Sequence, residues 1–193
     1  MLISNSSPSC PRIPARIANV IAVTISDIQA AINNLFFDID KVHPDEDHIF
    51  YDFLDYLCKT VEEINDISEI KFILENKSWW DSVDLLASNI LGKYAKKFPE
   101  EMDLVVESWQ EETSIWLHRS CLIYQLKYKD TVDLERLSYL ITCYKSNKTF
   151  FIQKAIGWSL REVSKWNPDW VRKTVGFHEL RGLAFREAMK YVK

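Results

Sequence analysis

Apolar residues recur three and four positions apart along most of the chain, the spacing of a helix with one buried face. No segment shows the strict apolar–polar alternation of a half-buried strand. Helices are predicted at residues 26–37, from Pro44 onward, and at 67–75, 79–97, 99–112, 114–127, 133–145, 149–165, 168–175 and 184–192. The pattern therefore predicts an all-α protein.

Glycine and proline are too scarce for a sheet fold. The 193 residues include four Gly and six Pro, and three of the prolines lie within the first fourteen positions. Sandwiches, barrels and doubly wound sheets need many more turn residues than this. The sequence also contains no G-x-G-x-x-G, G-x-x-x-x-G-K or G-x-S-x-G motif, which argues against dinucleotide, P-loop and serine-hydrolase chemistry.

A weak repeat runs through the second half of the chain. Trp80, Arg119 and Trp158 are separated by 39 residues each, and each lies within a predicted helix. A period of about 40 residues built from two antiparallel helices is typical of HEAT-like α-solenoids. The predicted fold class is thus an all-α, HEAT-like helical repeat solenoid of antiparallel helix pairs, in which these three residues face one concave groove.

Charge is distributed unevenly along the chain. The formal net charge is −4, but residues 116–193 contain 15 Lys and Arg against 7 Asp and Glu, and residues 1–115 contain 9 against 21. A basic region can bind a phosphate backbone even on an acidic protein, because charges farther away than about 10 Å are screened. The groove is therefore expected to be basic and to bind nucleic acid, although a solvated face without a partner has the same pattern.

The length suits one domain rather than two. We expect residues 1–17, which are rich in Ser and Pro, to form a disordered tail, and residues 18–193 to form a single solenoid domain. The four Cys and four His show no metal-ligand spacing, so no metal is expected. The apolar run at 18–25 is too short to span a bilayer, and a soluble intracellular protein is expected.

Four separated motifs resemble the AlkD-type DNA alkylation repair glycosylases, a family of HEAT-like repeat proteins. They are SWWDSVD at 78–84, IWLHR at 115–119, LKYK at 126–129 and FIQKAIGWSLRE at 151–162, and REA at 186–188 resembles the closing motif of the family. The match covers about residues 46–192 in one register. The first 45 residues do not align, so the chain can be a shortened or divergent member of the family.

The resemblance implies a DNA N-glycosylase that grips duplex DNA. Such an enzyme hydrolyses the N-glycosidic bond of cationic purines alkylated at N3 or N7, without a base-flipping pocket and without a cofactor. By the same resemblance, Asp84 corresponds to the catalytic carboxylate, Trp80 and Trp158 line the cleft, and Arg119 grips a phosphate. Further basic residues are matched to DNA contacts: Lys127, Lys154, Arg161 and Arg186.

Two less specific interpretations accompany this one. A HEAT-like scaffold that binds damaged or branched DNA, or a protein, without turnover would have the same groove. Five further tryptophans (Trp79, Trp109, Trp116, Trp166 and Trp170) are expected to pack between helices, and Glu162 is expected to be a carboxylate on the helix surface. A monomer is the simplest expectation for a solenoid that wraps DNA.

Overall fold

The computed structural model describes residues 67–75 and 80–192, which belong to a compact unit formed by residues 51–193. All regular structure in these residues is helical, so the all-α prediction is confirmed. The elements in chain order are α4 (Ile67–Glu75), α5 (Trp80–Leu86), η3 (Ala87–Leu91), α6 (Gly92–Lys97), α7 (Pro99–Gln110), α8 (Ile115–Ile123), η4 (Lys129–Thr131), α9 (Leu134–Tyr144), α10 (Phe150–Ser164), α11 (Pro168–Phe177) and α12 (Gly182–Ala188).

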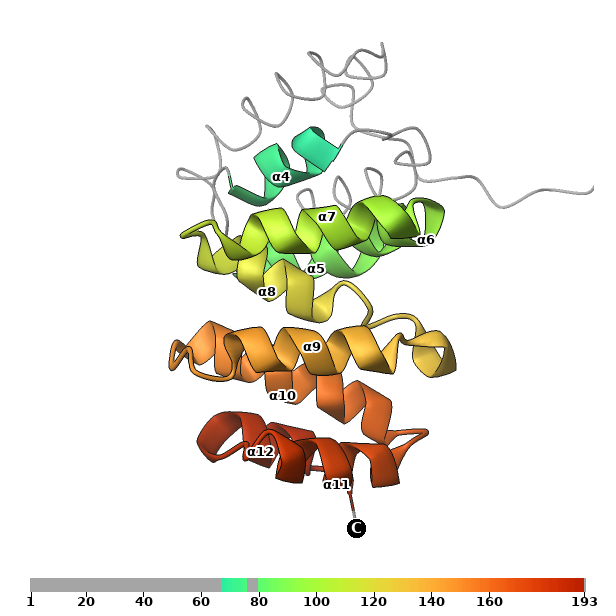
Figure 1. Cartoon of the computed structure of the whole chain (residues 1–193), viewed down its shortest axis with the longest axis vertical. Coiled ribbons are helices and arrows are strands. Elements are labelled where there is room, and N and C mark those ends of the chain that lie inside the picture. Colours follow the sequence, from blue (N-terminus) through green and yellow to red (C-terminus); the bar gives the residue numbers. More distant parts are fainter. Residues whose placement is uncertain (1–66, 76–79, 193) are drawn as a thin grey trace, which may run out of the picture. The chain divides into compact units, whose positions relative to one another are not determined.

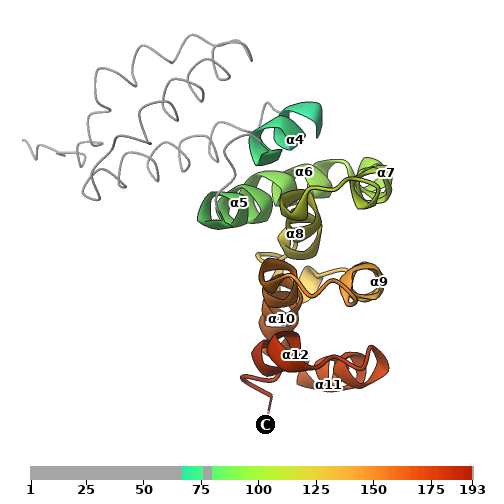
Figure 2. The ribbon, with the colours of Figure 1, turned by 90° about the vertical axis from the view of Figure 1, so that its left-hand side faces the viewer.

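The helices of this unit stack in pairs, as the repeat predicts (Figure 1). Figure 2 shows α8, α10 and α12 in one layer, and α7, α9 and α11 in a second layer to its right. Helix α8 packs against α5 and against α10, and α10 packs against α12.

Local sequence signals set the starts of several helices. Pro99 and Pro168 occupy the first helical turn of α7 and α11, where the missing N–H of proline costs nothing. The Asp133 carboxylate accepts a hydrogen bond from the backbone N–H of Arg136 at 2.9 Å, and Asn167 accepts one from Trp170 at 3.1 Å. These side chains satisfy N–H groups that a helix start otherwise leaves unpaired.

Several predicted helices differ in detail from the structure. The predicted helix at 79–97 is helical over 80–97 but contains the π-helical turn η3. The predicted helix at 114–127 ends at Ile123, and the last helix runs over 182–188 instead of 184–192. After Ile123 the Gln125 side chain accepts a hydrogen bond from the backbone N–H of Asp133 at 2.8 Å, which links the segment after α8 to the start of α9.

Two glycines allow helices to approach each other closely. A Cβ added to Gly157 of α10 would lie 2.5 Å from the Cβ of Glu187 and 2.9 Å from the carbonyl oxygen of Ala184, both on α12. A Cβ on Gly92 would lie 2.6 Å from the carbonyl oxygen of Tyr124. Real Cβ atoms do not come this close to other atoms, so any side chain at Gly157 or Gly92 would push the helices apart.

Several predictions fall on residues that the structure does not describe. These are the helices at 26–37 and from Pro44, the boundary of the N-terminal tail at residue 17, and the packing of Trp79. No helix in the two described ranges is both long and apolar enough to cross a membrane.

Candidate functional site

Helices α5 and α10 carry the two tryptophans that are predicted to line the cleft, and both lie on one cleft. Trp80, Asp84 and Trp158 all line it, and the cleft measures about 440 Å³. Trp80 is 46% exposed, which is unusual for so large an apolar side chain. We call this the tryptophan cleft; its remaining lining residues are Leu85, Ser88, Leu126, Lys127 and Glu162.

Asp84 is held by a two-pronged ion pair with Arg119. The Arg119 Nε donates to Asp84 Oδ1 at 2.6 Å, and the Arg119 Nη2 donates to Oδ2 at 2.8 Å. The side chains of Arg119 and Asp84 are 3% and 13% exposed. A planar guanidinium that meets both oxygens of a carboxylate fixes its position and its orientation. The carboxylate therefore sits at the cleft in one defined orientation.

Arg119 also connects this pair to α10. Its Nη1 donates to the carbonyl oxygen of Phe151 at 2.6 Å, and its guanidinium carbon lies 6.0 Å from the centre of the Phe151 ring. Phe151 in turn packs on Trp116 of α8, with the ring centres 5.0 Å apart. A single buried arginine of α8 thus ties Asp84 of α5 to Phe151 at the start of α10.

These contacts bear on the predicted phosphate contact of Arg119. Three of the five N–H groups of the guanidinium donate to Asp84 and Phe151. The two remaining N–H groups could bind a phosphate oxygen without breaking the ion pair. The Arg119 side chain is almost fully buried, however, so little of it is accessible. The phosphate contact therefore stays a prediction, and the visible contact of Arg119 is the one that orients Asp84.

The other basic residues matched to DNA contacts lie in different surroundings. Lys127 is exposed, lines the tryptophan cleft and donates a hydrogen bond to the Asn89 side chain of η3. Arg186, on α12, is exposed. Neither Lys154 nor Arg161 lines the cleft; their side chains reach Glu187 instead.

Glu187 of α12 is the shared partner of these two cations. Lys154 Nζ lies 2.7 Å from Glu187 Oε1, and Arg161 Nη1 lies 2.5 Å from Oε2. The hydrogen bond from Lys154, together with the charges of Lys154 and Arg161, lowers the pKa of Glu187 below its ordinary value, although burial opposes the shift. These pairs hold α10 against α12, so the DNA contacts predicted for Lys154 and Arg161 stay predictions.

Sequence reasoning did not place Glu162 at the cleft, although the structure does. Glu162 is on α10, four residues after Trp158, and lines the tryptophan cleft. Its carboxylate is ion-paired with Lys165 at 2.5 Å. The signal was present in the sequence, because Glu162 follows Trp158 at the same spacing at which Asp84 follows Trp80.

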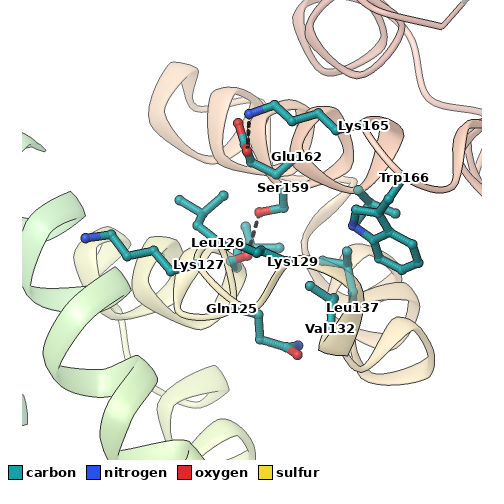
Figure 3. Close-up of a pocket in the computed structure, with 12 residues that line it drawn as sticks. Gln125, Leu126, Lys127, Lys129, Val132, Leu137, Ser159, Glu162, Lys165 and Trp166 are labelled. Carbon is teal, nitrogen blue, oxygen red and sulfur yellow. Dashed lines mark hydrogen bonds and ion pairs between the residues drawn. The ribbon is translucent and has the colours of Figure 1, made fainter.

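A second cavity of about 540 Å³ adjoins the tryptophan cleft. Figure 3 shows Trp166 on one side of it, the Glu162–Lys165 pair along its edge, and Lys127 extending away from it on the other side. Leu126, Lys127 and Glu162 line both spaces. Trp166 is therefore a cavity wall as well as a packing residue, and Glu162 stands where the two spaces meet.

Comparisons with known proteins identify the family of this chain. The family model described as DNA alkylation repair enzyme matches residues 39–192. A solved structure titled as a predicted DNA alkylation repair enzyme from Enterococcus faecalis is similar at 25% sequence identity and a TM-score of 0.66, over 93% of this chain and 95% of that chain. No curated protein matches the sequence. Because the family model spans most of the chain and the helical stack is shared, this protein belongs to the DNA alkylation repair enzyme family.

Proposed function

We propose that this protein is a DNA N-glycosylase, which hydrolyses the N-glycosidic bond of cationic N3- or N7-alkylated purines in duplex DNA. The observation that carries the proposal is the tryptophan cleft, where Trp80, Trp158 and Asp84 meet and Arg119 fixes the carboxylate. The family supports a DNA alkylation repair role. The reaction class is inferred from the chemistry of these side chains.

The substrate class follows from charge. A purine alkylated at N3 or N7 is already a cation, so it leaves as a neutral base without being protonated first. As the bond from C1′ to nitrogen breaks, positive charge moves to the sugar, as it does in glycoside hydrolysis. The carboxylate of Asp84 stabilises this charge, because it is held in place before the reaction begins.

The two indoles favour the same charge. The face of an indole attracts a cation by about 0.5–2 kcal/mol, more where water is excluded. Trp80 and Trp158 line the cleft with Asp84, so they can contact the lesion or the sugar as it turns cationic. Selectivity then comes from the reactivity of a cationic nucleotide, and neutral lesions are expected to be poor substrates. The proposed enzyme needs no base-flipping pocket and acts as an intracellular monomer.

The same geometry also fits the scaffold alternative. A bare carboxylate would repel DNA phosphates, but Arg119 offsets the charge of Asp84. The presence of Asp84 therefore does not separate an enzyme from a scaffold that binds DNA without turnover. Measured base release does separate them.

The test compares wild type with Asp84→Asn on methylated duplex DNA. Wild type should release 7-methylguanine and 3-methyladenine. The rate of base release by Asp84→Asn should be lower by at least about 10²-fold, as expected when a preorganised electrostatic contact is removed. The matched control is Asp169→Asn on α11, where the carboxylate is 80% exposed and the change should have no effect. Duplex binding without release by wild type would instead assign the scaffold function.

A further inference from the structure

The repeat places a second carboxylate beside the second tryptophan. Trp158 and Glu162 on α10 follow Trp80 and Asp84 on α5 by 78 residues in both cases. Residues four apart lie on the same face of a helix, so each helix presents an indole and a carboxylate side by side. All four residues line the tryptophan cleft.

The two carboxylates are restrained very differently. Asp84 is 13% exposed, and both of its oxygens accept hydrogen bonds from Arg119. Glu162 is 26% exposed, and its Oε2 is paired with Lys165, the residue directly after α10, which is itself 55% exposed. Exposed pairs of this kind contribute little and open readily. Glu162 can therefore turn toward the cleft, whereas Asp84 cannot turn away from Arg119 without breaking the fork.

The proposed reaction needs a proton acceptor that Asp84 is poorly placed to be. When the cationic purine departs with the electron pair of the C1′–nitrogen bond, water adds to C1′ and must lose one proton. A carboxylate whose two oxygens already accept from a guanidinium has fewer lone pairs left and is a weaker base. A second carboxylate across the cleft would meet this need.

We propose that Glu162 is a second catalytic residue, which accepts the proton of the attacking water while Asp84 stabilises the cationic sugar. This inference rests on the proposed glycosylase function. The water oxygen forms a bond to C1′, the released proton passes to the Glu162 carboxylate, and solvent later removes it. Lys127, Lys129 and Lys165 line the cavity that Glu162 borders, and Lys165 is the one paired with its carboxylate.

The experiment measures single-turnover base release with enzyme in excess over methylated duplex DNA. Glu162→Gln should lower the rate by about 10²-fold, the lower end of the range for general base catalysis, with unweakened duplex binding. Glu162→Asp should recover part of the rate. Added formate should speed Glu162→Ala and leave wild type unchanged, because it supplies the missing carboxylate. The charge-matched control is Glu135→Gln, on the exposed surface of α9, which should release base at the wild-type rate.

Each outcome decides a different statement. Release by Glu162→Gln within about twofold of wild type overturns the inference, as does a loss explained entirely by weaker DNA binding. If wild type and Glu162→Gln both release base while Asp84→Asn does not, the glycosylase proposal stands and only the role of Glu162 fails. If wild type releases no base, both proposals fail together.

Discussion

Replacement of Arg119 by alanine is expected to destabilise the protein strongly, because it leaves Asp84 without its guanidinium. The change removes the contacts at 2.6 and 2.8 Å to the carboxylate and the 2.6 Å hydrogen bond to Phe151. Deleting one member of a buried ion pair costs about 3–5 kcal/mol. Asp84 borders an open cleft, so the lower end applies, about 3 kcal/mol. For a chain of this size the melting temperature should fall by about 6–12 °C.

A double-mutant cycle separates the pair from general damage. Asp84→Ala, Arg119→Ala and the double variant are compared with wild type by urea and thermal unfolding. Because the two side chains are in direct contact, the double variant should lose about 1–3 kcal/mol less than the sum of the single losses. Arg119→Lys should lie between wild type and Arg119→Ala, since an ammonium cannot form the two-pronged contact. Strictly additive losses would refute the argument that the two side chains stabilise each other.

Three further outcomes are expected. Gly157→Ala should cost about 1–3 kcal/mol by urea unfolding, because its Cβ would lie 2.5 Å from the Cβ of Glu187; Gly176→Ala, with nothing within 4 Å, should not destabilise, and equal losses would contradict the packing argument. The pKa of Glu187 is lowered by the hydrogen bond from Lys154, so its contribution is present above the ordinary carboxyl pKa and is lost as pH falls through the lowered one. The melting temperature of Glu187→Gln should therefore fall less than that of wild type between neutral pH and about pH 3. Equal falls would show that the pairs of Glu187 with Lys154 and Arg161 do not stabilise the fold. Lys127→Ala should reduce the slope of log affinity for duplex DNA against log salt by about one, and an unchanged slope would place Lys127 outside the phosphate contacts.

The helices and the place of the two tryptophans on one cleft could be predicted from the sequence. Helical periodicity, first-turn prolines and capping residues act within a few positions of each other, so the sequence carries them directly. The 39-residue period predicted that Trp80, Arg119 and Trp158 face one groove. Trp80 and Trp158 do line one cleft, whereas Arg119 is buried and does not line it. In the described residues, the π-helical turn η3, the 3-10 turn η4 and several helix ends escaped the pattern.

The side-chain partners could not be predicted in the same way. Arg119 is predicted to contact a phosphate, and the structure shows its guanidinium bound to the carboxylate of Asp84, 35 positions earlier in the sequence. Lys154 and Arg161 were expected to contact DNA, and both reach a carboxylate of α12. Long cationic side chains pair with whichever carboxylate the packing of helices brings within reach, and this distance is not encoded in local spacing.

The sequence by itself determined that the protein is helical, that its helices repeat, and that indoles and carboxylates recur at the same positions of two repeats. Each of these properties depends on residue type and on separation along one helix. Tertiary structure alone decided that Asp84 is locked by Arg119 while Glu162 is held only by a surface lysine. The reason is physical: whether a charged group is fixed or free depends on the groups from other helices that surround it, and these are assembled only when the repeats stack.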